Sequence, residues 1–336
     1  MRTGLHLENY PVPRHSIFAV KLTAHAARTS KEILDVTNLD KAGHGVLEVF
    51  HRAMQRYKSM PVSESDLVDT KAQRFVTVEE VVPLGQWVQA SIDSGHYGQP
   101  GRVRSAKTGE VEHIHDGESS ATSIVRVLAL APPGATAVVL IFEKVGLKSV
   151  SGTVIKPLKA ALKARFPALV FESETITETS AWLEDASVEK LTATYSEWVS
   201  DRAEAGEAPP ISGEYVVVLR PVNGLSLWKR LRSKEITPGK LIGVPMRDEP
   251  NEAEVQVTSL GKTKTFVIGN ERTPGISELV SDGSKPLTDS DFRTACFSMA
   301  KEISLRVTGQ KWEGTYEHGP WDDERLKWPG GGSSDE

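Results

Sequence analysis

The chain has 336 residues, of which 39% are hydrophobic and 25% are charged, and its formal net charge at pH 7 is −5. These values are those of a soluble globular protein that can bury a substantial core. The longest apolar region, 125–142, contains Arg126 and two prolines, so the sequence argues against a membrane-spanning segment.

Cysteine usage and the N-terminus restrict the compartment and the chemistry. Cys296 is the only cysteine, which excludes a disulfide within the chain and a thiolate zinc cluster. Residues 1–14 lack the apolar core of a signal peptide, so we expect a reducing, cytoplasmic location. The sequence has no P-loop, no G-x-G-x-x-G loop and no repeat of fixed period, and we therefore expect no cofactor.

The first elements in chain order are a predicted strand over 16–22 and an amphipathic helix over 46–57. We interpret the outward side of this helix mainly as a solvated face, and as a contribution to a basic surface only secondarily. It carries His51, Arg52, Arg56 and Lys58. Two further strands are predicted over 75–82 and 87–92, with a turn at 83–85 between them.

A second basic group follows near Tyr97. Arg102, Arg104 and Lys107 occupy alternate or near-alternate positions and could share one face of a strand. Arginines beside an aromatic ring suit stacked bases, although the same residues are common on surface loops.

The segment 111–116 has the most enzyme-like local pattern. In a strand, His113 and His115 project from one face and Asp116 lies just beyond them. Two imidazoles on one face could belong to a metal site or to an acid–base pair. Catalytic zinc usually needs three protein ligands, and no third partner has a recognisable spacing, so we favour surface or structural histidines and predict no metal.

The centre of the chain predicts the core of the fold. Apolar runs over 124–130 and 135–142, separated by Ala-Pro-Pro-Gly at 131–134, indicate two antiparallel strands covered on both faces. A helix over 154–166 follows, in which Pro157 is tolerable only in the first turn, and then a strand over 168–171.

The exposed side of this central helix is basic. Lys156, Lys159 and Lys163 recur at i, i+3 and i+7, and no Asp or Glu occurs from 144 to 171. The pattern has two interpretations, a solvated face on an edge helix or a phosphate-binding ridge. Other basic residues near the helix are Lys144, Lys148 and Arg165.

The charge then inverts in an acidic segment, 172–207. The apolar spacing over 188–199 indicates a helix, whereas the Thr-rich run 191–195 could instead be a strand. The acidic face could be plain solvation, could neutralise the basic ridge, or could face a basic partner chain.

The segment 201–213 is polar and rich in Ala, Gly and Pro, and it is the best candidate linker. A strand over 214–219, a short basic helix, a hairpin over 253–268 and a capped helix over 288–308 are predicted after it. We expect Trp228 to anchor a core in the short helix, and Cys296 to be a buried packing residue in the last helix.

The tail 312–328 contains three tryptophans in a polar setting. Such a segment docks either onto the protein's own surface, which we favour, or onto a partner.

The sequence therefore predicts an α+β protein with a mixed, largely antiparallel sheet packed with helices in the N-terminal part. The expected divisions are an N-terminal α+β domain at 1–200, a linker at 201–213, a smaller α+β C-terminal domain at 214–328 and a disordered tail at 329–336.

Charge segregation favours a nucleic-acid-binding accessory protein, in nucleic-acid metabolism or in defence against foreign nucleic acid. One alternative is a metal-dependent hydrolase or nuclease that uses His113 and His115. Another is a protein-interaction subunit that docks through the acidic segment 172–207 or the tail 312–328. The candidate nucleic-acid-binding residues are Arg102, Arg104, Lys107, Lys148, Lys156, Lys159, Lys163, Arg165, Lys229, Arg230, Arg232 and Lys234.

Overall fold

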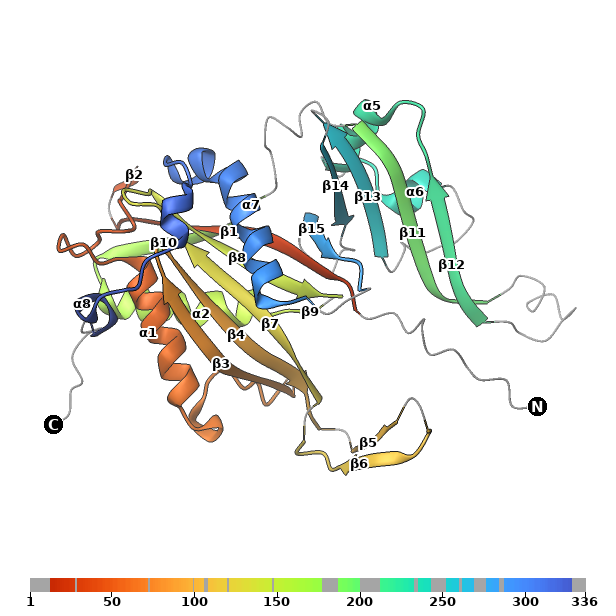
Figure 1. Cartoon of the computed structure of the whole chain (residues 1–336), viewed down its shortest axis with the longest axis horizontal. Coiled ribbons are helices and arrows are strands. Elements are labelled where there is room, and N and C mark those ends of the chain that lie inside the picture. Colours follow the sequence, from red (N-terminus) through yellow and green to blue (C-terminus); the bar gives the residue numbers. More distant parts are fainter. Residues whose placement is uncertain are drawn as a thin grey trace, which may run out of the picture. The chain divides into compact units, whose positions relative to one another are not determined.

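The computed structural model describes most of the chain, and Figure 1 shows its helices and strands. The described residues are 13–27, 29–71, 73–98, 100–105, 108–119, 121–146, 148–176, 187–199, 212–232, 235–242, 252–259, 262–268, 276–283 and 287–327. No helix among these residues is long and apolar enough to cross a lipid bilayer.

The chain divides into two compact units. The first contains 1–15, 19–175 and 281–336, and the second contains 16–18 and 176–280. This division differs from the expected boundary at 201–213, because the residues after 280 return to the first unit.

The fold is α+β with a large antiparallel sheet, as the sequence predicts. The strands of the first unit are β1 (His15–Ala26), β2 (Thr29–Ile33), β3 (Arg74–Leu84), β4 (Trp87–His96), β5 (Gly101–Arg104), β6 (Val111–His115), β7 (Ala121–Leu130), β8 (Ala137–Val145), β9 (Lys148–Ser149) and β10 (Leu169–Ile176). Its main sheet has the order β1–β8–β7–β4–β3, with β2 and β10 paired to β1 and β9 paired to β8. Strands β5 and β6 form a separate hairpin.

The helices of the first unit come from both ends of the chain. They are α1 (Val46–Ser59), α2 (Ser151–Arg165), α7 (Asp289–Thr308) and α8 (Asp323–Lys327), with the 3-10 turns η2 (Val62–Glu64) and η3 (Gly314–Glu317). Helix α7 has the expected cap, because the side chain of Thr288 accepts a hydrogen bond from the backbone N–H of Asp291. Cys296 is fully buried on its apolar side, as expected.

Strands β7 and β8 form the expected antiparallel pair at the centre of this sheet. Val127 pairs with Phe142 and Leu130 pairs with Val139. Every residue of β8 is buried, which requires cover on both faces. The turn between them uses Gly134 at φ 73°, a left-handed conformation that glycine adopts at little cost.

Helices cover the two faces of this sheet. Gln89 and Arg126 point toward α7, because Gln89 bonds Arg293 and Arg126 bonds Asp289. Side chains alternate along a strand, so Val88 points to the opposite face, where α1 packs against β3, β4 and β7.

Helix α2 extends further toward the N-terminus than its apolar spacing predicts. It begins at Ser151 and contains Pro157 in its second turn, so the expectation that Pro157 sits in the first turn is wrong. Proline has no N–H, so the helix continues past this residue without the hydrogen bond to the carbonyl of Thr153. The buried side of α2 is Val154, Leu158 and Leu162, which agrees with the predicted apolar face.

The second unit has its own hydrophobic core. Its elements are β11 (Ser187–Val199), β12 (Ser212–Leu219), α5 (Gly224–Arg232), α6 (Pro238–Ile242), β13 (Glu252–Ser259), β14 (Lys262–Ile268) and β15 (Ile276–Ser281), and the strand order is β12–β11–β13–β14–β15. Trp228 anchors the core as expected, 1% exposed, with its ring centroid 5.4 Å from that of Phe266.

The segment 188–199 is a strand, β11, and its interpretation as a helix is wrong. Its pairing with β13 is irregular between Val188 and Lys190, where β11 has an additional residue. That irregularity puts Val188 and Leu191, three residues apart, in the same core. From Leu191 onward, burial alternates as the period of a strand requires.

The C-terminal segment 312–327 docks onto the first unit itself. Trp312 and Trp321 are buried, and the indole N–H of Trp321 donates to the carbonyl of Gly85 at 3.0 Å. The guanidinium of Arg325 lies 3.7 Å from the ring centroid of Trp321 and pairs with Glu48 of α1 at 2.6 Å. These contacts agree with the expected docking of the tail onto the protein's own surface. Trp328 lies outside the described residues.

Candidate nucleic-acid interface

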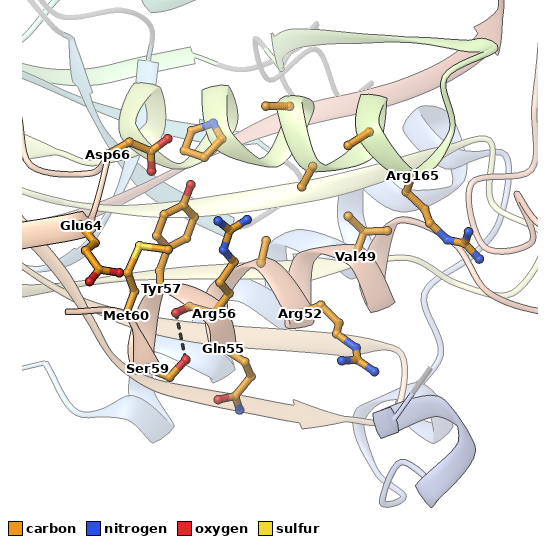
Figure 2. A pocket seen from close by; sticks show the side chains of 15 residues that line it. Val49, Arg52, Gln55, Arg56, Tyr57, Ser59, Met60, Glu64, Asp66 and Arg165 are labelled. Carbon is orange, nitrogen blue, oxygen red and sulfur yellow. Dashed lines mark hydrogen bonds between the residues drawn. The ribbon is translucent and has the colours of Figure 1, made fainter. Parts of the chain in front are cut away.

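A groove of about 1230 Å³ runs between α1 and α2 in the first unit (Figure 2). The two helices are about a hundred residues apart in the sequence and pack against each other. On α2 the groove is lined by Pro157, Ala160, Ala161 and Ala164, which are small enough to leave space beside the neighbouring helix. The cavity therefore arises from a small-residue face of α2 opposite the longer side chains of α1.

Three arginines line this groove. Arg52 and Arg56 come from α1 and Arg165 comes from the last turn of α2. Within the described part of the chain, neither Arg52 nor Arg56 forms an ion pair, and the Nε of Arg52 is buried without a hydrogen-bond partner. The guanidinium of Arg165 lies 5.7 Å from the centroid of the Phe166 ring. The guanidinium groups of Arg52 and Arg56, unpaired among the described residues, have donors that suit phosphate oxygens.

The other end of the groove is acidic. Glu64 and Asp66 are exposed there, and Figure 2 shows both carboxylates at the opposite end from Arg52 and Arg165. Burial and the hydrogen bond with Asp66 raise the pKa of Tyr57 to about 12, so the phenol stays protonated at neutral pH. The charge of the groove thus changes sign along its length.

The predicted lysine ridge on α2 lies beside this groove and does not line it. Positions 156, 159 and 163 fall on a face adjacent to the small residues of the groove. Lys163 uses its ammonium within the protein, donating to the carbonyls of Pro167 at 2.7 Å and Leu169 at 3.1 Å. Lys156 is exposed and Lys159 is half-buried. Of the predicted residues of this region, Arg165 alone lines the groove, and the side chain of Lys148 lies outside the described residues.

The second predicted basic group lies on the β5–β6 hairpin. Arg102 is exposed, and Arg104 donates to the carbonyl of Gly109 at 2.9 Å. Lys107 lies outside the described residues. The hairpin is separate from the main sheet, and none of its residues lines the groove.

The third predicted basic group belongs to the second unit. Arg230 of α5 is exposed and pairs with Glu235 at 3.0 Å, so an acid of the same unit neutralises it. The side chains of Lys229 and Arg232, and the whole of Lys234, lie outside the described residues.

The histidine pattern falls on strand β6. His113 pairs with Val103 and His115 with Gly101 of β5, and His113 is exposed. The carboxylate of Asp116 accepts hydrogen bonds from Ser119 and from the N–H of Glu118, and these bonds lower its pKa. No group of three potential metal ligands occurs among the described residues. A metal site at His113 and His115 stays a prediction.

The described part of the acidic segment is partly neutralised within the first unit. Glu174 pairs with Lys21 at 2.6 Å, and Glu172 lies 3.5 Å from the ring nitrogen of His25. Residues 177–186 and 200–207 of this segment lie outside the described residues.

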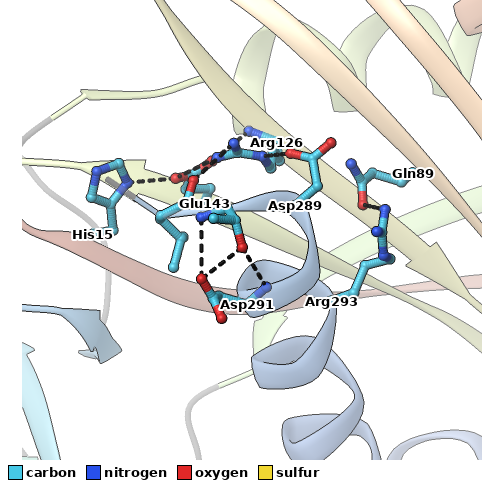
Figure 3. Close-up of polar contacts among 9 residues, drawn as sticks. His15, Gln89, Arg126, Glu143, Asp289, Asp291 and Arg293 are labelled. Carbon is cyan, nitrogen blue, oxygen red and sulfur yellow. Dashed lines mark hydrogen bonds and ion pairs between the residues drawn. The ribbon is translucent and has the colours of Figure 1, made fainter. Parts of the chain in front are cut away.

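A second polar cluster lies beneath the start of α7 (Figure 3). The fully buried carboxylate of Glu143 contacts Arg126 at 3.0 Å and the ring of His15 at 2.5 Å. Arg126 also bonds Asp289 at 2.5 Å and the carbonyl of Leu287. Burial alone would lower the pKa of Arg126, but Glu143 and Asp289 outweigh it and raise that pKa. These charges satisfy one another and fasten α7 to the sheet.

Sequence reasoning underweighted the arginines of α1. Arg52 and Arg56 are spaced four residues apart on the outward side of an amphipathic helix, which is typical of a solvated face. The small residues at 157, 160, 161 and 164 were the available signal, because such a stripe leaves space beside a neighbouring helix. It does not say which helix approaches.

Comparison with known proteins finds no family model, no curated protein and no solved structure that matches this chain.

Proposed function

We propose that this protein binds nucleic acid through the groove between α1 and α2, as an accessory protein of nucleic-acid metabolism or of defence against foreign nucleic acid. The observation that supports this proposal is the convergence of Arg52, Arg56 and Arg165 on one groove of a chain whose net charge is −5. A cytoplasmic location, where the single thiol stays reduced, is part of the proposal.

The groove supplies the chemistry that a nucleic-acid backbone requires. Guanidinium groups bind phosphate oxygens through two parallel N–H donors. The small apolar residues that α2 contributes to the groove offer no directional hydrogen bonds to base edges. We therefore expect binding with little sequence preference and with a strong dependence on salt.

The test compares two double variants with equal changes of charge. The variant Arg52→Ala/Arg56→Ala removes two groove cations, and the control Arg306→Ala/Lys311→Ala removes two exposed cations outside the groove. Fluorescence anisotropy with labelled oligonucleotides at several salt concentrations measures the affinity of each.

We expect the groove variant to lose affinity about tenfold or more, since hydrogen bonds to charged groups contribute about 1.5–3 kcal/mol each. The slope of log affinity against log salt should also fall by about 1 to 2, because fewer counterions are released. Equal affinities for the groove variant, the control and the unmodified protein would refute the proposal.

A further inference from the structure

The shape of the groove restricts the kind of nucleic acid that can enter it. Two helices in contact have axes roughly 8–10 Å apart. The major groove of a DNA duplex alone is about 12 Å wide, and the whole duplex is wider still, so a duplex cannot be enclosed between α1 and α2. Arg52 and Arg165 are half-buried rather than projecting, which places their donors within reach of a narrower chain.

The lining of the groove fits a single strand. The side chains of Pro157, Ala160 and Ala164 present an apolar surface against which sugars and unstacked bases can bury apolar area. Arg52, Arg56 and Arg165 then reach the phosphates of the same strand. A single strand can present its bases and its phosphates to the same protein surface, whereas a duplex turns its bases inward.

The acidic end restricts which part of a strand the groove can hold. Glu64 and Asp66 would repel a phosphate, and a terminal phosphate carries a charge of about −1.5 to −2 at neutral pH. A terminal sugar hydroxyl is a hydrogen-bond donor and suits a carboxylate. A strand that continued through the acidic end would bring each further phosphate against these carboxylates.

We infer that the groove holds the unphosphorylated end of a single-stranded nucleic acid. The terminal sugar hydroxyl lies at Glu64 and Asp66, and the phosphates that follow it lie along the arginines. This inference rests on the proposed function of the same groove.

The experiment measures binding of one internally labelled oligonucleotide in several forms, to the full-length protein. Four forms are linear single strands that carry hydroxyls at both ends, a phosphate at the 5′ end, a phosphate at the 3′ end, or phosphates at both ends. The other two forms are a circularised single strand and a blunt-ended duplex. We expect the doubly phosphorylated strand, the circle and the duplex to bind at least about fivefold more weakly than the strand with two hydroxyl ends. Whichever single phosphate reproduces the loss identifies the end that is held.

The variant Glu64→Gln/Asp66→Asn should abolish the discrimination against the phosphorylated strand and the circle, because neutral amides do not repel the phosphate. It should keep the discrimination against the duplex, which depends on width. The control Glu313→Gln/Glu324→Gln makes the same change of net charge at exposed positions outside the groove and should keep the discrimination.

The outcomes separate this inference from the proposed function. If all forms bind equally and still depend on Arg52 and Arg56, the groove binds nucleic acid but the inference about strand ends is wrong. If no form shows binding that depends on these arginines, the proposed function fails and this inference fails with it.

Discussion

The first unit uses arginine in two opposite ways. Arg126 is held among Glu143, Asp289 and the carbonyl of Leu287, so its charge and its donors are matched inside the protein. Arg52 and Arg56 lie along a groove and form no ion pair within the described residues. One set of guanidinium groups is used by the fold, and the other remains available to a ligand.

The contrast teaches that basic residues indicate a binding surface only after their internal partners are known. In the sequence, Lys163 and Arg230 are as good candidates for phosphate binding as Lys156 is. In the structure, Lys163 binds carbonyls of its own unit and Arg230 binds Glu235. A cation with an internal partner must lose that partner before it binds a phosphate. Substitutions that remove single cations can therefore separate the two roles.

The largest effect is expected for Arg126→Met. Without the guanidinium, the fully buried carboxylate of Glu143 keeps only His15 and the backbone N–H of residue 126, and no lysine or other arginine among the described residues pairs with it. Breaking a buried ion pair costs roughly 3–5 kcal/mol of unfolding free energy. Urea denaturation measures this value. The matched variant Arg52→Met removes a guanidinium that has no ion pair, and should change stability by less than about 0.5 kcal/mol. Equal losses in both variants would contradict the comparison.

A smaller effect of opposite sign should follow when Glu143→Met is added to Arg126→Met. The double variant no longer buries an unmatched carboxylate, so it should recover roughly 1 kcal/mol or more relative to Arg126→Met alone. The same denaturation experiment gives this coupling. The comparison also needs the single variant Glu143→Met. If the loss of stability in the double variant equals the sum of the losses in the two single variants, the two charges do not depend on each other.

Lowering the pH should decrease the free energy of unfolding because of His51, the residue before Arg52 on α1. Burial, with a further contribution from Arg52, lowers the pKa of His51 below 6.5, and its ring packs at 5.4 Å against Trp321. Below the unfolded value of 6.5 the unfolded chain binds a proton that the folded chain does not, so stability falls as pH decreases.

The loss through His51 is limited to about 1.4 kcal/mol per pH unit for one proton. Thermal unfolding between pH 7.5 and 5.5 checks it, with His51→Phe as the variant that keeps a ring and cannot titrate. An unchanged pH dependence in His51→Phe would assign the effect to other groups.

The smallest effect distinguishes two lysines of the predicted ridge. Lys163→Met removes two hydrogen bonds to carbonyls beyond the end of α2 and should cost about 0.5 kcal/mol, because these bonds are exposed to solvent. Lys156→Met removes an exposed charge and should change stability by only a few tenths of a kcal/mol. Thermal denaturation at matched salt compares the two. An equal response would mean that the bonds of Lys163 do not stabilise the fold.

The parts of the fold that follow from local pattern could be predicted from the sequence. The buried pair β7 and β8, the turn at Gly134 and the cap of α7 all depend on residues close together in the chain. Strand β11 was ambiguous because an additional residue near Lys190 gives its first apolar residues the spacing of a helix. A strand irregularity of this kind cannot be distinguished from helical periodicity without its partner strand.

The groove could be predicted only in part. The basic character of α1 and α2 was readable, but their packing joins residues about a hundred positions apart, and no local signal specifies it. The buried cluster had a clearer signal. Arg126 interrupts an apolar strand covered on both faces, so it required a buried acid, and the sequence did not identify Glu143 as that acid.

The return of the chain to its first unit after residue 280 has a consequence for synthesis. During translation, β7 and β8 are synthesised long before α7. Two of the hydrogen-bond partners of Arg126 in β7, however, are Asp289 and the carbonyl of Leu287, which lie at the start of α7 or just before it. Until this last stretch leaves the ribosome, one face of β8 lacks its cover. Strands β7 and β8 are therefore translated before residues 176–280 of the second unit, yet they complete their packing only after those residues have been made.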